Sequence, residues 1–249
     1  PFFVRKRVKA RVEKEASAAG KRRVDIDDVR AAQVRYLNTM EREIKGYRIE
    51  ACFGAGGCPN RAIESDGLFR RIEETLQGAD LLDFLKTHVN GPLKFHHEFT
   101  VTLADCPNAC SQPQIRDIGI IGAAVPRVSD EACTGCGACV AACKETAIRL
   151  EENGKAPRID MDRCLYCGSC AAGCPTGAIL TKSRGYRVLL GGKLGRHPRL
   201  GMELPGLFDE DAVVEIVGDC LRFYKEKGQN GERFAALVSE SDVRRLSGR

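Results

Sequence analysis

The sequence predicts an α+β protein in three parts: a small N-terminal helical module, an α+β domain split into two stretches, and a cysteine-rich segment inserted between them. Helical spacing marks residues 1–48, while residues 49–127 and 181–249 mix strand-like alternation with helical periodicity. Residues 128–180 hold eight cysteines in two similar groups. We expect the domain boundaries to follow these ranges.

The N-terminal module is predicted from valine spacing and charge. Val4, Val8 and Val12 recur at i, i+4 before Gly20, and a second helix is expected to run from about residue 25 to Met40. Residues 1–48 carry 14 Lys and Arg against 7 Asp and Glu. A basic end of this kind suits a solvated helix face or an acidic protein partner, and without interleaved aromatic residues we expect no nucleic-acid binding.

The two stretches of the α+β domain contain recognisable strands and helices. "FTVTL" at 99–103 alternates as a half-buried strand does, and "DIGIIGA" at 117–123 reads as a buried strand. Residues 67–89 are predicted to be helical, and "YRVLLGG" at 186–192 is a strand that runs into two glycines. Residues 209–228 combine an acidic start, helical periodicity and a glycine stop.

Hydropathy and cysteine usage indicate the compartment. The longest apolar stretch, 118–125, is far shorter than the roughly 20 residues of a membrane span, and the charged N-terminus does not resemble a secretory signal. We therefore expect a cytoplasmic protein. Reducing compartments disfavour disulfides, so metal binding is the expected use of the thirteen cysteines. Cys220 stands alone and is predicted to be a buried apolar residue.

The cysteine-rich segment repeats one spacing twice. "CTGCGACVAAC" and "CLYCGSCAAGCP" both follow the pattern C-x2-C-x2-C-x3-C. This resembles a bacterial-type ferredoxin with two [4Fe–4S] clusters, in which each loop supplies three ligands and the other repeat supplies the fourth. The expected ligand sets are Cys133, Cys136, Cys139 and Cys174 for one cluster, and Cys164, Cys167, Cys170 and Cys143 for the other.

Zinc is the alternative for paired CxxC motifs. The absence of histidine from the eight-cysteine pattern and the presence of Pro175 favour iron and sulfur. Lys144 departs from the ferredoxin pattern, which usually has proline after the last cysteine of each repeat. A cation at that position is expected to shift the potential of the neighbouring cluster.

Four further cysteines form two looser pairs. Cys52 and Cys58 are spaced C-x5-C, and Cys106 and Cys110 are spaced C-x3-C. Neither pair has the spacing of a ferredoxin or a zinc knuckle, but together they supply four ligands. We expect them to hold a third cube.

Four motifs, "CFGAGGCPNRA", "ADCPNACSQPQIRDIGIIGA", "GYRVLLGGKLGRHPRLG" and "FYKEKGQNGERF", resemble the siroheme sulfite and nitrite reductases, particularly the short anaerobic type with an inserted ferredoxin. The resemblance implies a sulfite/nitrite reductase-like cluster domain in which Cys110 also bridges to siroheme. It further implies that a set of small, amide and cationic residues approaches the carboxylates of the macrocycle: Asn108, Gly191, Gly192, Lys193, Gly195, Arg196 and Arg199. An ordinary basic turn is the alternative for the loop.

Residues 1–33, "PFFVRKRVKARVEKEASAAGKRRVDIDDVRAAQ", resemble the C-terminal module of the B subunit of light-independent protochlorophyllide reductase. In that family the module accompanies an iron–sulfur enzyme that reduces a tetrapyrrole. None of the catalytic subunit of that enzyme is present, so the substrate is not carried over.

The sequence departs from the reductase pattern where substrate cations are expected. The family has two lysines on the strand that leads into the C-x3-C motif, whereas this chain has Glu98 and Thr100. A carboxylate there repels an anion unless it is protonated or turned away. Arg61 and Lys94 are the candidate catalytic cations. Lys94, His96 and His97 together either substitute for the two lysines or form a solvated approach to the strand, and the solvated approach is the favoured alternative.

Two expectations about partners and function follow. The family normally places a ferredoxin-like half-domain before the first cysteine pair, whereas this chain has only the small helical module and a short connector there. A homo- or hetero-oligomer is therefore expected to close the siroheme pocket. A redox protein is expected to exchange electrons with the clusters. Reduction of sulfite, nitrite or a related small substrate is the leading function. The alternatives are a siroheme-free, three-cluster electron-transfer subunit and, last, a third cluster that is only structural.

Overall fold

The computed structural model describes residues 43–151, 154 and 156–246. The two helices predicted before Met40 lie outside the described residues. The described residues from Lys45 onward belong to one compact unit. Its first strand, β1 (Tyr47–Ala51), begins inside the range assigned to the helical module and was not predicted, because five residues give little alternation to recognise. Among the described residues, no helix is both long and apolar enough to cross a bilayer.

The main sheet has the order β1-β2-β3-β6-β7. Strands β1, β2 (Phe99–Ala104) and β3 (Ile118–Val128) are parallel, whereas β6 (Ile179–Leu190) and β7 (Met202–Glu203) join antiparallel. The predicted strands at 99–103, 117–123 and 186–192 all fall within these elements. The parallel arrangement brings the carboxyl ends of β1 and β2 to the same edge of the sheet.

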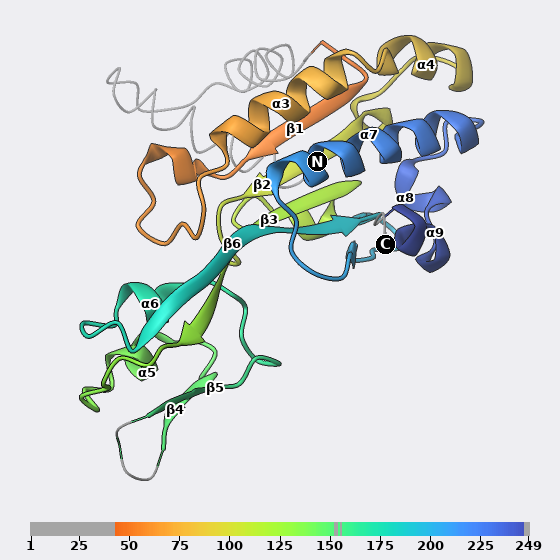
Figure 1. Cartoon of the computed structure of the whole chain (residues 1–249). Helices are drawn as coiled ribbons and strands as arrows, with labels where there is room; N and C mark the ends of the chain where they lie inside the picture. The colour runs from red at the N-terminus through yellow and green to blue at the C-terminus, as the bar shows by residue number, and fades with distance from the viewer. Residues whose placement is uncertain (1–42, 152–153, 155, 247–249) are drawn as a thin grey trace, which may run out of the picture. The chain divides into compact units, whose positions relative to one another are not determined.

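One face of the sheet is covered by helices α3 (Asp66–Gln77), α4 (Leu81–His88) and α7 (Glu210–Lys227), as Figure 1 shows. Phe99, Val101 and Leu103 of β2 point into this core, and alternate residues therefore point to the opposite face. Burial of each large apolar side chain contributes about 1.5–3 kcal/mol. The sheet thus has one closed face and one face on which polar side chains lie.

The helices follow the sequence signals with one difference. The range 67–89, predicted as helix, is divided into α3 and α4 because Asp80 adopts a left-handed conformation, with φ of 49°. Helix α7 agrees with its prediction: the side chain of its N-cap residue, Asp209, accepts a hydrogen bond from the Ala212 N–H, and lysines lie in its last turn. Short helices α8 (Phe234–Leu237) and α9 (Glu240–Leu246) follow it.

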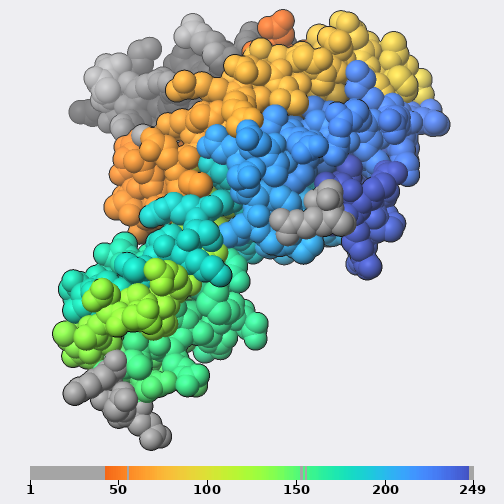
Figure 2. Space-filling model, viewed as in Figure 1, coloured from red at the N-terminus to blue at the C-terminus, as the bar shows by residue number. Residues whose placement is uncertain are grey.

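Strands β3 and β6 pair from Ile118–Leu190 to Val128–Ile179, with a register shift at Val125–Pro126. The cysteine-rich insert, residues 129–178, is held between their far ends (Figures 1 and 2). It contains α5 (Ala138–Ala142), α6 (Ser169–Ala172) and a small hairpin of β4 (Ile148–Leu150) and β5 (Pro157–Ile159). Its small core consists of cysteines and isoleucines: Cys139, Ile148, Cys170 and Ile179.

Candidate iron–sulfur and cofactor site

The two looser cysteine pairs meet at the carboxyl edge of the parallel strands. Cys52 directly follows β1, Cys58 follows the 3-10 turn η1 (Phe53–Gly56), and Cys106 and Cys110 lie in the loop after β2. All four line one cavity of about 190 Å³ together with Arg61 and Asn108. Four thiols around one cavity are the donor set of a [4Fe–4S] cube.

Hydrogen bonds to sulfur surround this cavity. The Asp105 N–H donates to Cys52 Sγ at 3.3 Å, and the Asn108 side-chain amide donates to Cys110 Sγ at 2.9 Å. The pKa of the Cys106 thiol is raised, and burial is the largest cause. A buried thiolate is therefore favoured only with a compensating metal charge beside it. Cys110, in contrast, is exposed, so its sulfur is open to a second group.

The Cys52–Cys58 loop rests on the buried residue Asp105. A side chain at Gly54 would collide with the Asp105 carboxylate, so the close approach requires glycine. Ser65 Oγ donates to Asp105 Oδ1 at 2.5 Å, and the Asp105 carbonyl accepts from the N–H groups of Ala62 and Ile63. These contacts position both cysteine pairs relative to each other.

In the insert, each group of three cysteines lies next to one cysteine of the other repeat. Burial raises the pKa of Cys139, with Cys174 and Cys133 as close thiol neighbours. Burial likewise raises the pKa of Cys164, whose thiol neighbours are Cys167 and Cys143. Cys139 and Cys164 thus each have a thiol neighbour from their own repeat and one from the other repeat.

Backbone N–H groups also point at sulfur in the insert. Gly135, Ala147 and Tyr166 donate to the sulfurs of Cys133, Cys143 and Cys164 at 3.3–3.4 Å. Hydrogen bonds of this kind are a determinant of iron–sulfur potentials. All thirteen cysteines are free of disulfides, and Cys220 is fully buried in the core as predicted. Among the residues described, no three His, Cys, Asp or Glu side chains are grouped around a single-ion site.

The insert is seated on the sheet next to the third cysteine group. The Ala124 N–H of β3 donates to the Tyr166 carbonyl at 2.6 Å, and Arg184 donates to the Ala62 carbonyl at 2.9 Å. A cavity of about 290 Å³ lies at this junction. Its lining includes residues of both cysteine regions: Cys106, Pro107, Asn108, Cys143, Lys144, Cys164, Cys167 and Cys170.

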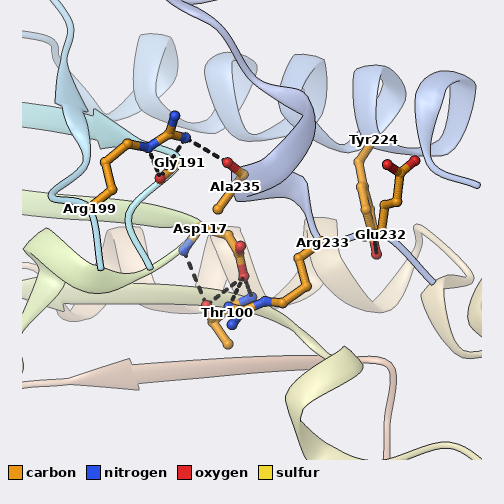
Figure 3. Close-up of polar contacts among 8 residues, drawn as sticks. All are labelled: Thr100, Asp117, Gly191, Arg199, Tyr224, Glu232, Arg233 and Ala235. Carbon is orange, nitrogen blue, oxygen red and sulfur yellow. Dashed lines mark hydrogen bonds and ion pairs between the residues drawn. The ribbon is translucent and has the colours of Figure 1, made fainter. Parts of the chain in front are cut away.

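The glycine-rich basic loop follows β6 and packs on the segment after Cys110. A Cβ at Gly192 would lie 2.8 Å from the Arg116 carbonyl oxygen, so glycine permits this approach. Lys193 and Arg199 pair through their backbones. The Arg199 guanidinium donates to the carbonyls of Gly191 and Ala235, as Figure 3 shows. Arg199 therefore ties the loop to α8, whereas Gly195 and Arg196 are exposed at its tip.

The two positions at which the resembling family has lysines are buried, and their side chains are hydrogen-bonded. Glu98 is 2% exposed, and its carboxylate accepts a hydrogen bond from the Lys45 N–H at 3.1 Å. Thr100 is 7% exposed and bonds to Asp117. Of the candidate cations, Arg61 lines the third cysteine cavity and lies 3.7 Å from Glu64, whereas Lys94 is exposed in the loop before β2.

Sequence reasoning missed four charged residues on the polar face of the sheet, Arg48, Arg116, Asp117 and Arg233. They come from three separate segments, and their proximity depends on strand register. Motif membership was the available signal: Arg116 and Asp117 lie within "ADCPNACSQPQIRDIGIIGA", and Arg233 lies within "FYKEKGQNGERF".

Residues 46–247 match the family model described as the nitrite and sulphite reductase 4Fe-4S domain. The chain belongs to this family. Residues 1–33 match the model for the proto-chlorophyllide reductase 57 kD subunit, which confirms the predicted resemblance of the N-terminal module.

Named relatives and a solved structure agree with the family. The coenzyme F420-dependent sulfite reductase of Methanocaldococcus jannaschii is 38% identical over 76% of this chain and 28% of its own length. A subunit of the anaerobic sulfite reductase of Salmonella typhimurium is 32% identical over 83% of this chain and 62% of its own length. The chain therefore spans less than two thirds of either relative. Dissimilatory sulfite reductase I has the same fold, with a TM-score of 0.54 at 19% identity over 80% of this chain and 51% of that one.

Proposed function

We propose that this nitrite and sulphite reductase family member is an oxidoreductase that carries electrons through two ferredoxin-type clusters to a third [4Fe–4S] cluster coupled to siroheme, and reduces sulfite, nitrite or a related small substrate. The observation that carries the proposal is the junction cavity, which Cys106 lines together with Cys143, Cys164, Cys167 and Cys170. A cluster of the insert and the third cluster would thus be neighbours.

The order of electron transfer follows from the same cavity. The cluster held by Cys164, Cys167, Cys170 and Cys143 would be the one adjacent to the third cluster. The cluster held by Cys133, Cys136, Cys139 and Cys174 would lie further away and receive electrons first. The thiol neighbours of Cys139 and Cys164 support these two ligand sets.

The residues around Cys110 fit siroheme. Cys110 is exposed and accepts a hydrogen bond from Asn108, so its sulfur can serve both the cube and an adjacent metal. Gly192 gives the basic loop its close packing, and Lys193 and Arg196 offer cations to carboxylates. Bound there, siroheme would supply an iron that takes the substrate and passes electrons to it.

This chain's own residues would position the cofactor and maintain the electron path. Arg199 fixes the basic loop through the Gly191 and Ala235 carbonyls, and Arg61 brings a cation to the third cysteine cavity. The Ala124–Tyr166 hydrogen bond joins the insert to β3, which would keep the insert beside the third cysteine group. Lys94 is exposed in the loop before β2, so it would contact an anion only at the solvent-facing side of that loop.

A redox protein as electron donor and an oligomer that completes the pocket are part of the proposal. One relative is named as a subunit of an anaerobic sulfite reductase, which supports assembly with other chains. Thirteen free cysteines support a reducing, cytoplasmic setting.

The second candidate function is a siroheme-free electron-transfer subunit with three clusters. It is favoured by Glu98 and Thr100, which stand where the family has lysines and are both buried. In this reading the third cluster passes its electrons to a partner enzyme.

Cofactor content distinguishes the two functions. Protein purified without oxygen, from a host that makes siroheme, should contain siroheme near one per chain and iron for three cubes. The variant Cys110→Ser should lose siroheme, while the control Cys220→Ser, far from the site, should retain both cofactors. Three cubes without siroheme in the unmodified chain would exclude the reductase and support the electron-transfer subunit.

A further inference from the structure

Three arginines surround the strand position that Thr100 occupies. Arg48 of β1 is the register partner of Thr100 on the adjacent parallel strand. Tyr47 and Ile49 pack against the core, so Arg48 and Thr100 point to the same, polar face of the sheet. A cation is therefore present one strand away from the position where the family has a lysine.

Arg116 and Arg233 approach the same face from two other segments. Arg233 Nη2 lies 3.4 Å from Asp117 Oδ2, the oxygen that also accepts from Thr100 (Figure 3). Arg116 Nη2 lies 3.1 Å from Glu50 Oε2, and Arg48 Nε lies 3.4 Å from Glu50 Oε1. Two carboxylates thus pair with the three guanidinium groups, and the buried Glu98, two residues before Thr100, adds a third carboxyl group nearby.

The arginine charges also affect the pKa values of neighbouring groups in this cluster. Burial is the main cause that lowers the pKa of Arg116. The nearby charges of Arg48 and Arg233 also lower this pKa, whereas those of Glu50 and Asp117 raise it. Burial also lowers the pKa of His97, and the neighbouring His96, Lys94 and Arg233 add to this effect. A small anion on this face would reduce the mutual repulsion of these groups.

Donors for such an anion remain unused. Among the described residues, Arg116 Nε and Arg233 Nε are buried side-chain donors without a hydrogen-bond partner, as is the acceptor Asp117 Oδ1. A closed ion-pair network would satisfy these groups internally. The side chains of Arg48, Arg116 and Arg233 are 26%, 20% and 33% exposed. The cluster is therefore partly buried but still accessible from solvent.

We propose that Arg48, Arg116 and Arg233 bind the small oxyanion substrate, in place of cations at positions 98 and 100. Guanidinium groups present paired N–H donors that match the oxygens of sulfite or nitrite, and partial burial strengthens such bonds. Asp117 and Glu50 orient the guanidinium groups. The inference rests on the proposed function and identifies the residues that would select its substrate.

Arginine labelling tests this directly in the full chain with its clusters assembled. The protein is treated with phenylglyoxal with and without sulfite, and modified arginines are identified by mass spectrometry. We expect sulfite to protect Arg48, Arg116 and Arg233 but not Arg187, a control on the same sheet that pairs with Glu203 at 2.6 Å. Equal labelling with and without sulfite would overturn the inference.

Binding measurements complete the test. Arg48→Gln and Arg233→Lys should weaken sulfite binding to the siroheme-loaded protein, followed optically, by about tenfold or more, while Arg187→Gln leaves it unchanged. Iron and siroheme contents should be equal in all variants. Loss of siroheme from the arginine variants would assign these residues to the macrocycle's carboxylates and overturn the inference. If the unmodified chain contains no siroheme, the proposed function fails, but sulfite protection in the labelling experiment still decides whether the anion site exists.

Discussion

Thr100 donates both its backbone N–H and its hydroxyl to one carboxylate oxygen of Asp117, at 2.9 and 2.6 Å. The Asp117 N–H donates back to Thr100 Oγ1 at 3.1 Å. This reciprocal contact joins the start of β2 to the start of β3 on the polar face of the sheet. It occupies the position where the family has a lysine and places the Asp117 carboxylate under Arg233.

Asp117→Asn should destabilise the protein by about 1–3 kcal/mol, because a buried acceptor of several hydrogen bonds loses its charge and its contact with Arg233. The shift in apparent unfolding midpoint, measured by circular dichroism on cluster-loaded protein, checks this. Asp130→Asn, at an exposed position, is the matched control. An equal midpoint for the two variants would show that the Thr100–Asp117–Arg233 contact carries little stability.

Cluster-removing variants test the proposed order of electron transfer. Cys167→Ala should remove the cluster next to Cys106 and abolish reduction of the third cluster by a donor protein. Cys136→Ala should remove the outer cluster, which blocks the donor protein but still allows a small reductant to act through the inner one. Electron paramagnetic resonance of the third cluster is the measurement. Normal donor-dependent reduction in Cys167→Ala contradicts the order.

Lys144 should raise the potential of the cluster that includes Cys143, because a cation in the junction cavity favours the added electron. Lys144→Gln is therefore expected to lower that potential in a redox titration. Lys86→Gln, on helix α4, should leave all potentials unchanged. A potential that stays constant or rises in Lys144→Gln would refute this role.

Gly192→Ala should displace the basic loop, since its Cβ would meet the Arg116 backbone at 2.8–2.9 Å. We expect siroheme content to fall while iron for the three cubes is retained. Gly218→Ala, on helix α7 with no backbone neighbour so close, should affect neither. Full siroheme content in Gly192→Ala would mean that the loop does not shape the cofactor site.

Alkaline pH should destabilise the fold through Tyr224. Burial raises the pKa of Tyr224 to about 12, above its ordinary value of 10.0, so the folded state retains a proton that the unfolded state releases. The contribution is therefore complete below pH 10 and is lost as the pH rises from 10 toward 12. Melting temperatures of the unmodified protein and Tyr224→Phe across this range should converge; parallel curves would contradict the prediction.

Several parts of the fold were predictable because their signals are local. The alternation in "FTVTL", the acidic start and glycine stop around α7, and the duplicated cysteine spacing each lie within a few residues. The family resemblance was likewise carried by contiguous motifs. The break between α3 and α4 was not predicted, because it depends on the left-handed conformation of Asp80.

The arginine cluster could not be predicted in the same way. Arg48 and Thr100 are neighbours only through the parallel register of β1 and β2, and Arg233 reaches Asp117 across 116 positions of sequence. The role of Arg199 also required the structure, because its basic motif suggests a ligand contact whereas its guanidinium bonds to two backbone carbonyls. Long-range contacts of this kind leave no periodic pattern in the sequence.

Anaerobic mixing of the fully reduced protein with sulfite tests the central claim most directly. The siroheme absorption, the paramagnetic resonance of the three clusters and the sulfide formed are followed together. We expect a siroheme signal that responds to sulfite, reoxidation of all three clusters, and sulfide in proportion to the electrons lost. Clusters that stay reduced in sulfite and in nitrite, with no siroheme signal, would contradict it and identify the chain as an electron-transfer subunit.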